Sequence, residues 1–460
     1  MKTDLKKLEK FFSAKNVAII GASRRIGSFG RIVAQNFLNP KFKGKLFLIN
    51  PKADKILGQK CYKNLNQIKQ KIDLVIIVVP APIAIKVFEE CGKKKISNVV
   101  MITAGFDELG NTDLSKKLKK SVNKYKKTTR LIGPNCLGVL NPENQIDTLF
   151  LPTNRLKRPE KGNVSFISQS GAMGTAVLDW ALREEYGIAK FVSYGNAYDV
   201  DETDLIEYLA EDKKTDVIGV YLEGVKNGRK FFEVAKRVSK KKPIIILKGG
   251  TSKAGKKAVL SHTASLAGSS QVYEALFSQM PLIEAKNLVE FFNYCKIFAK
   301  SPRPKGNNVL IMSEGGGFAV LATDSAEKYG LQLAQMGKEH LKKIQKVIPK
   351  YVKAKNPLDL TGDVTNDMYC SAIKEGLLDK NVDMIVVLLL YQVPALNSQA
   401  VETLMELNEK KKKPIVAVTI GGKYSEMHKR AMEKEGIVTF LYPHNAMQAL
   451  RKLFDYYNFD

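Results

Sequence analysis

The stretch Val164-Ser-Phe-Ile-Ser-Gln-Ser-Gly-Ala-Met-Gly174 joins an apolar run to a turn of small residues. The run has the length and the branched side chains of a buried strand, and the turn after it can open a helix. The same plan occurs at Val17–Gly27 and at Val309–Gly317. Three such units, with further apolar runs alternating with helical stretches, predict an α/β fold of parallel sheets covered by helices.

Two linkers divide the chain into segments of similar length. Arg158–Asn163 and Arg303–Asn307 are basic, contain proline, and each ends in Lys-Gly-Asn just before one of the apolar runs. At roughly 150 residues per domain, the chain has room for about three domains. We therefore expect domains over residues 1–155, 156–302 and 303–460.

The composition is that of a soluble globular protein with a strong basic bias. Hydrophobic residues make up 44% of the chain, and the formal net charge is +28. The lysines are spread over helix ends and helix faces rather than one stripe, so they favour anionic small molecules over a nucleic-acid partner. No apolar run approaches the roughly 18 residues of a membrane helix, and the five cysteines never form C-x-x-C. We expect a cytoplasmic protein with no membrane partner and no metal site.

Each glycine-rich turn after a predicted strand can offer backbone N–H groups to an anion at a helix N-terminus. One such turn is more simply a tight strand–helix junction, but three in one chain favour anion binding. The first turn lacks the G-x-G-x-x-G spacing of NAD-binding proteins, and Lys52 follows the next strand where those proteins carry an acidic residue. A nucleotide with an extra phosphate, such as coenzyme A (CoA), fits this basic position better.

An asparagine in a rigid turn is a candidate for orienting the substrate. Asn135 lies between proline and cysteine in the motif Leu131-Ile-Gly-Pro-Asn-Cys-Leu-Gly138. Its side-chain amide could be an oriented donor to a carboxylate or a carbonyl group. An ordinary turn asparagine accounts for the motif equally well.

The segment Gly249–Gly268 holds the candidate for phosphoryl transfer. It follows an apolar run and combines glycines, lysines and one histidine, His262, so we expect a phosphate-binding loop. His262 could carry a phosphoryl group on one ring nitrogen while Glu223 orients the other, and the Ser168–Gly171 turn could hold the phosphoryl oxygens. A hydrogen-bonded structural histidine is an equally common outcome at a loop position.

Other catalytic schemes fit the sequence less well. Gly250–Lys257 nearly spells a Walker A loop, but a lysine stands where that loop carries its magnesium-binding hydroxyl. A P-loop NTPase is therefore a minority interpretation. The chain has no G-x-S-x-G around a serine nucleophile and no H-E-x-x-H for zinc.

A series of short motifs, taken together, resembles one family over nearly the whole chain. In order they are VAIIGAS, INPK, VPAP, ITAG, IGPNCLG, ISQSGAMG, YLEG, SHTASLAG, MSEGGG and NPLDLTGD. The set resembles the α subunit of NDP-forming acyl-CoA synthetases, typically the ADP-forming acetyl-CoA synthetase, and their relative succinyl-CoA synthetase. The resemblance implies a Rossmann-like CoA-binding domain followed by two flavodoxin-like ligase domains.

The resemblance also implies roles for individual residues. His262 would be transiently phosphorylated and Glu223 would hold it, while Gly133 and Asn135 would lie near the acyl group. The residues implied in CoA binding are Gly21, Ser23, Arg24, Arg25, Ile26, Lys52, Pro80, Ile102 and Thr103. Those implied in cradling the phosphohistidine, at two helix N-termini, are Ser170, Gly171, Ala172, Gly315, Gly316 and Gly317.

The family reaction needs a part for which the predicted domains leave no room. Acyl-CoA, ADP and phosphate give a carboxylic acid, ATP and CoA through an acyl phosphate and a phosphohistidine, and the ADP/ATP site with Mg²⁺ belongs to an ATP-grasp module. The resemblance implies a separate ATP-grasp β subunit and an α2β2 heterotetramer, so we expect the chain alone to make no ATP. A nucleotide-independent acyl or phosphate transferase and a CoA-binding regulatory subunit remain alternatives. Acetate is the default acid; the choice of ADP over GDP and the direction of flux stay open.

Overall fold

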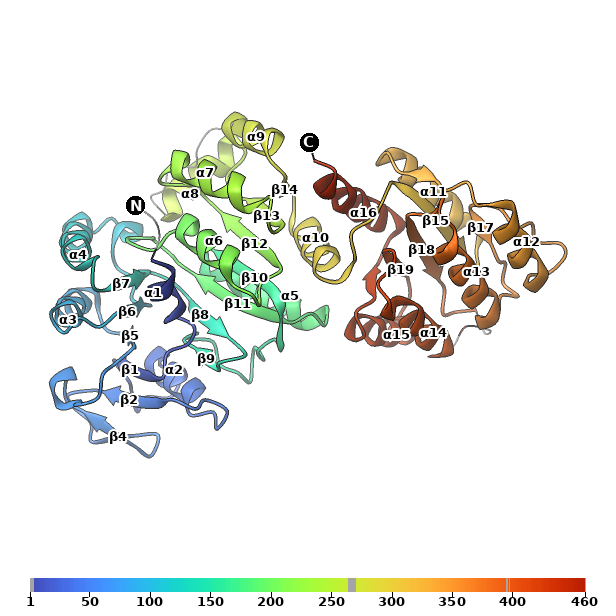
Figure 1. The fold of residues 1–460 in the computed structure, drawn as a ribbon. Helices are drawn as coiled ribbons and strands as arrows, with labels where there is room; N and C mark the ends of the chain where they lie inside the picture. The colour runs from blue at the N-terminus through green and yellow to red at the C-terminus, as the bar shows by residue number, and fades with distance from the viewer. Residues whose placement is uncertain (1–3, 264–269, 394–395, 397, 460) are drawn as a thin grey trace. The chain divides into compact units, whose positions relative to one another are not determined.

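The computed structural model describes residues 4–263, 270–393, 396 and 398–459, with the backbone alone for residues 260–263 and 270. They form two compact units, Met1–Arg183 with Gly187–Glu284, and Glu184–Tyr186 with Ala285–Asp460. The first runs from blue to yellow in Figure 1 and the second from yellow to red. Within the described residues, no helix is both long and apolar enough to cross a membrane.

The first sheet of the first unit has the strand order β3-β4-β2-β1-β5-β6-β7, and it is parallel except for the short β3. Counted along the chain without β3, the order is 3-2-1-4-5-6, the order of a Rossmann fold. The direction of winding reverses between β1 and β5, which is where such sheets bind ligands. The strands are β1 (Asn16–Ile20), β2 (Lys45–Ile49), β3 (Lys55–Ile56), β4 (Gln59–Tyr62), β5 (Leu74–Ile77), β6 (Asn98–Met101) and β7 (Arg130–Ile132), and the helices are α1 (Leu5–Glu9), α2 (Phe29–Phe37), η1 (Leu65–Gln67), α3 (Ala81–Lys93), η2 (Asp107–Leu109) and α4 (Thr112–Tyr125).

The second sheet of this unit has the order β14-β13-β12-β10-β11-β8-β9. Its winding reverses between β10 and β12, as in a flavodoxin-like sheet. The strands are β8 (Gly138–Asn141), β9 (Ile146–Asp147), β10 (Lys161–Ser168), β11 (Ile188–Ser193), β12 (Val217–Leu222), β13 (Ile244–Lys248) and β14 (Leu282–Ala285), and the helices are α5 (Gly171–Arg183), α6 (Glu202–Glu211), α7 (Gly228–Val238), α8 (Lys253–Thr263) and α9 (Ser270–Gln279).

The expectation of purely parallel sheets is wrong at the edge of this second sheet. β8 pairs antiparallel with β11, and β9 pairs antiparallel with β8. The chain leaves β7 through a sharp turn at Gly133–Asn135 and crosses from the first sheet to the second. Residues 138–147 therefore belong to the second sheet, and one continuous apolar core joins the two sheets from Val17 to Ile246.

The second unit holds a parallel sheet of order β16-β15-β18-β19-β20, with β17 paired to β15. Its winding reverses between β15 and β18, again as in a flavodoxin-like fold. The third predicted domain begins at residue 303, whereas this unit also takes in residues 285–302 and Glu184–Tyr186. The strands are β15 (Asn308–Ser313), β16 (Gln332–Leu333), β17 (Leu358–Asp359), β18 (Met384–Leu389), β19 (Ile415–Thr419) and β20 (Val438–Phe440), and the helices are α10 (Leu288–Lys300), α11 (Gly316–Lys328), α12 (Lys338–Val347), α13 (Asn366–Leu378), α14 (Ser398–Glu409), α15 (Lys423–Lys434) and α16 (Pro443–Tyr457).

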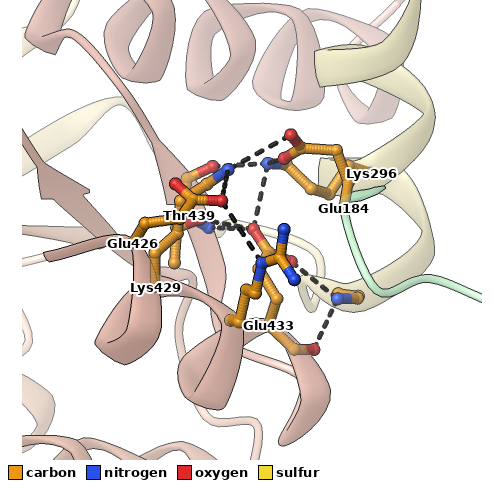
Figure 2. A network of polar contacts seen from close by, with 8 residues as sticks. Glu184, Lys296, Glu426, Lys429, Glu433 and Thr439 are labelled. Atoms are coloured by element: carbon orange, nitrogen blue, oxygen red, sulfur yellow. Dashed lines mark hydrogen bonds and ion pairs between the residues drawn. The ribbon is translucent and has the colours of Figure 1, made fainter. Parts of the chain in front are cut away.

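A buried ion cluster explains why Glu184–Tyr186 belong to the second unit (Figure 2). Lys296 Nζ lies 2.9 Å from Glu184 Oε2 and 2.9 Å from Glu433 Oε1, and Lys429 Nζ lies 3.1 Å from Glu184 Oε1. Burial alone would raise the pKa of the Glu184 carboxyl, but the two lysines lower it. A buried charge is tolerated when it is paired in this way, so the cluster fixes residue 184 between α10 and α15.

Candidate active site

The turn after β10 lies at the reversal point of the second sheet and opens helix α5. Ser168 Oγ donates a hydrogen bond to the Ser170 carbonyl oxygen at 2.6 Å, which closes the turn. The Gln169 side chain spans the reversal point, because its Oε1 accepts from the backbone N–H groups of Glu223 at 2.8 Å and Gly224 at 3.1 Å. The predicted phosphate turn and the predicted histidine-orienting carboxylate are thereby tied together.

A cavity of about 580 Å³ lies in the first unit, where the carboxyl ends of both sheets meet. Seven of the predicted site residues line it, drawn from those predicted to bind CoA, to lie near the acyl group and to bind phosphate. They are Pro80, Ile102, Thr103, Asn135, Ser170, Gly171 and Ala172. A larger polar cavity of about 830 Å³, beside α2 and β8, contains none of the predicted residues, and we do not assign the chemistry to it.

The Asn135 turn is rigid because other turns pack on its backbone. Asn135 has a φ of +57°, and its N–H donates to the Thr103 carbonyl oxygen at 2.9 Å. A Cβ on Gly195 would lie 2.1 Å from the Asn135 carbonyl oxygen, so only glycine allows this approach. Gly133, at φ +105°, likewise lies close to the Met101 carbonyl oxygen, 2.4 Å from where its Cβ would be. It supports the turn but does not line the cavity.

Glu223 follows β12 and is 4% exposed. Its Oε1 lies 3.4 Å from the Tyr221 hydroxyl, while its Oε2 is buried without a hydrogen-bond partner among the side chains that the structure describes. A buried carboxylate oxygen with spare acceptor capacity suits a ring N–H of histidine. Nearby, Lys248 Nζ donates to the Glu223 carbonyl oxygen at 2.9 Å, and burial lowers the pKa of this lysine to about 8.

The segment that carries His262 is not the open loop that the sequence suggested. Lys253–Thr263 forms helix α8, and Ser252 Oγ accepts a hydrogen bond from Gly255 N–H at 3.0 Å near its start. A serine at this place and the following alanines and lysines favour a helix, which the glycines and hydroxyls of the pattern obscured. The His262 backbone lies in α8; its side chain and residues 264–269 lie outside the described part. Helix α8 contacts η2, the short helix that follows β6 of the first sheet.

The remaining residues predicted for CoA binding lie at the carboxyl edge of the first sheet, in the turn after β1 and, for Lys52, after β2. Gly21 has a φ of +97°, and a Cβ there would lie 2.1 Å from the Val78 carbonyl oxygen. The Ser23 hydroxyl accepts from Arg25 N–H at 3.1 Å, and Arg24, Arg25, Ile26 and Lys52 are exposed. Arg24, Arg25 and Lys52 form a cationic rim on the same edge as the cavity, although they do not line it.

The Gly315–Gly317 turn in the second unit repeats the geometry of the Ser168–Gly171 turn. Ser313 Oγ donates to the Gly315 carbonyl oxygen at 2.9 Å, as Ser168 does to Ser170. Glu314 takes the place of Gln169, because its carboxylate accepts from the Leu390 backbone N–H and from the Tyr369 hydroxyl. Burial raises the pKa of Glu314. The turn opens α11 in the way that the first turn opens α5.

Three residues of the site were missed as candidates: Gln169, Asn196 and Glu108. Gln169 lies inside the ISQSGAMG motif, so its position was marked although its role was not. Asn196 and Glu108 belong to no glycine-rich motif, and only the fold brings Asn196 to the cavity wall and Glu108 against it.

Comparison with known proteins decides the family. Subunit alpha of the ADP-forming acetate–CoA ligase I of Pyrococcus furiosus is 38% identical over 456 residues, which are 97% of each chain. The chain belongs to the ADP-forming acetate–CoA ligase family. The ADP-forming acetate–CoA ligase of Methanocaldococcus jannaschii is 40% identical over 96% of this chain, but the chain spans only 62% of that relative.

Domain and structure comparisons agree with the family. Models of a CoA-binding domain, a succinyl-CoA ligase-like flavodoxin domain and a ligase-CoA domain match residues 15–142, 161–298 and 309–453. A dinucleotide-forming acetyl-CoA synthetase 1 of Candidatus Korarchaeum cryptofilum, solved with phosphate and ADP, superposes with a TM-score of 0.91 at 33% identity, covering 99% of this chain and 97% of the other. The predicted family and fold class are therefore confirmed.

Proposed function

We propose that this chain is the α subunit of an ADP-forming acyl-CoA synthetase, with acetate as the default acid. One observation carries the proposal: a single cavity joins residues of the CoA-binding side to the Ser170–Ala172 turn, and Gln169 ties that turn to Glu223. Family membership supports it. The predicted domains, 1–155 for CoA, 156–302 for the histidine segment and 303–460 for the second ligase domain, are part of the proposal.

The proposed chemistry runs in three steps. A phosphate oxygen attacks the thioester carbonyl carbon, the C–S bond breaks, and CoA leaves as a thiolate that takes up a proton. His262 then attacks phosphorus of the acyl phosphate, and the carboxylate leaves. Finally an ADP oxygen attacks the phosphohistidine, which forms ATP and restores the ring.

This chain's residues supply the geometry for the first two steps. Backbone N–H groups at the start of α5 would hold the phosphate oxygens, since a helix N-terminus favours anions. Glu223 would accept the ring N–H of His262, which makes the other nitrogen a better nucleophile. The exposed residues Arg24, Arg25 and Lys52 would attract the CoA phosphates. The nucleotide and Mg²⁺ would bind to a separate ATP-grasp β subunit in a cytoplasmic α2β2 heterotetramer.

Transfer of labelled phosphate to the chain tests this function. Incubation with acetyl-CoA and labelled inorganic phosphate should give acid-labile, base-stable label on the wild-type chain and none on His262→Ala. Glu223→Gln should reduce the initial rate of labelling by about 10- to 100-fold, the scale of losing an orienting partner. ADP should discharge the label only when the β subunit is present.

Other results would point to the alternatives. CoA binding without any label on His262 favours a regulatory subunit, and acyl phosphate released without a labelled protein favours a nucleotide-independent transferase. Discharge of the label to ATP by the chain alone would contradict the need for a β subunit.

A further inference from the structure

Three polar side chains form a hydrogen-bonded chain that begins at one wall of the cavity. Asn135 Nδ2 donates to Asn196 Oδ1 at 3.3 Å, and Asn196 Nδ2 donates to Glu108 Oε2 at 2.6 Å. The other oxygen of Glu108 accepts from the backbone N–H groups of Gly105 at 2.5 Å and Phe106 at 3.1 Å. Asn135 and Asn196 line the cavity, and Glu108 lies behind them.

The direction of these hydrogen bonds is set from the Glu108 end. An ionised carboxylate can only accept hydrogen bonds, and two backbone donors hold this one in place. Asn196 must therefore turn its NH₂ group toward Glu108, which leaves its oxygen facing Asn135. Asn135 in turn must give an N–H to Asn196, so its own carbonyl oxygen is left over, together with the second hydrogen of its NH₂ group. Among the described residues no hydrogen bond is made to that oxygen.

The backbones that carry the two amides are held independently of the side chains. Asn196 N–H donates to the Pro134 carbonyl oxygen at 3.0 Å, and Lys226 Nζ donates to the carbonyl oxygens of Asn196 and Ala197 at 2.6 Å each. The positions of the two side-chain amides are therefore fixed by the backbone, and only the direction of their hydrogen bonds can change. Glu108 itself lies in η2, the element that α8 contacts.

We propose that Glu108 is a positioning residue that, through Asn196, fixes the Asn135 amide with its oxygen toward the bound substrate. The cavity then selects a ligand with a polar hydrogen at this point. Two participants in the proposed reaction carry one: the product CoA, on its thiol, and the substrate inorganic phosphate, on a protonated oxygen. The inference deepens the proposed function and rests on it for the identity of these ligands.

The variant Glu108→Gln reverses the chain of hydrogen bonds without removing it. The glutamine oxygen still accepts from Gly105 and Phe106, so its NH₂ group points to Asn196, and both asparagines turn over. Asn135 then offers N–H groups where its oxygen stood. If the thiol is the donor, calorimetry on the full chain should show about tenfold weaker binding of CoA, the scale of one hydrogen bond, with binding of acetyl-CoA unchanged or tighter. If phosphate is the donor, its binding weakens and that of CoA does not.

A second change should restore the original direction. In the double variant Glu108→Gln with Asn196→Asp, the new carboxylate accepts from both neighbours, so Asn135 again gives its N–H and presents its oxygen. Net charge is the same as in the wild type, and affinity should return to within about twofold. A purely structural role for Glu108 predicts no such rescue. Unchanged binding in the single variant, or no recovery in the folded double variant, overturns the proposal.

An NMR measurement separates this inference from the proposed function. In the full chain labelled with ¹⁵N-asparagine, the NH₂ signals of Asn135 and Asn196 should shift in Glu108→Gln and return in the double variant. A wild-type chain that binds neither CoA nor phosphate defeats the proposed function, whereas side-chain signals that do not move defeat the role of Glu108.

Discussion

At the scale of single residues, burial of an ionisable side chain makes the unfolding free energy depend on pH. Glu202, at the start of α6, is the clearest case. It is 2% exposed, and its Oε1 has no hydrogen-bond partner among the described residues. Burial, and secondarily the neighbouring Asp201, raise the pKa of this carboxyl from 4.5 to about 7. The folded state therefore binds the proton more tightly than the unfolded chain. The stability linked to this proton is fully present below about pH 4.5 and is lost as the pH rises through about 7.

Replacement of Glu202 by glutamine should remove this pH dependence. Relative to the wild type, Glu202→Gln should gain up to about 3 kcal/mol in unfolding free energy between pH 5 and pH 8, because the wild type must ionise a buried group. Urea unfolding at several pH values measures the difference. Glu211→Gln is the control on the same helix. The exposed Glu211 carboxylate lies 3.0 Å from Lys241 Nζ, which lowers the pKa of Glu211. The pH dependence of the unfolding free energy that Glu211 contributes should therefore be small and of opposite sign. Parallel stability curves for wild type and Glu202→Gln would rule out the assignment.

At the scale of elements, the strand–turn–helix junctions depend on glycines that allow two backbones to touch. Gly21→Ala places a methyl group on the Val78 carbonyl oxygen and also strains a positive φ, so it should cost more than about 3 kcal/mol of stability. Gly27→Ala is the matched control, since its φ is +78° but nothing lies within 4 Å of a new Cβ. It should cost about 1 kcal/mol. Denaturant midpoints measure both; equal losses would show that φ alone matters.

The same junctions show which parts of the fold could be predicted from the sequence alone. The strand at Val164–Ser168 and its turn were predictable, because branched apolar residues followed by glycine and serine are a local signal. The antiparallel β8 was not, since its partner β11 lies some 50 residues further along and only the crossing at Gly133–Asn135 brings them together. The helix at His262 was hidden by glycines and hydroxyls that also fit a loop. Glu108 and Asn196 carry no local signal, because their role depends on which turns meet.

At the scale of the whole molecule, the second unit is built from two separate segments of the chain. The buried ion cluster holds the first and shorter of them, Glu184–Tyr186, in place. Three residues after α5 belong to the second unit, and Glu184 is bound there by Lys296 and Lys429 (Figure 2). Helix α5 begins at the Ser168–Gly171 turn, so the N-terminal end of this helix lies at the proposed phosphate site and its C-terminal end is followed by the anchored residues.

Loss of one lysine should loosen this anchor. Lys296→Met leaves Glu184 and Glu433 with fewer cations in a buried place, which should cost about 3–5 kcal/mol in the second unit. Native-state hydrogen exchange should show the loss in α10 and α15 and not in the strands of the first sheet. Lys241→Met, which breaks an ion pair that is more than half exposed on both sides, should cost less than about 1 kcal/mol. Equal effects of the two variants, or faster exchange throughout β1 and β5 in Lys296→Met, would mean that the cluster does not stabilise the second unit specifically.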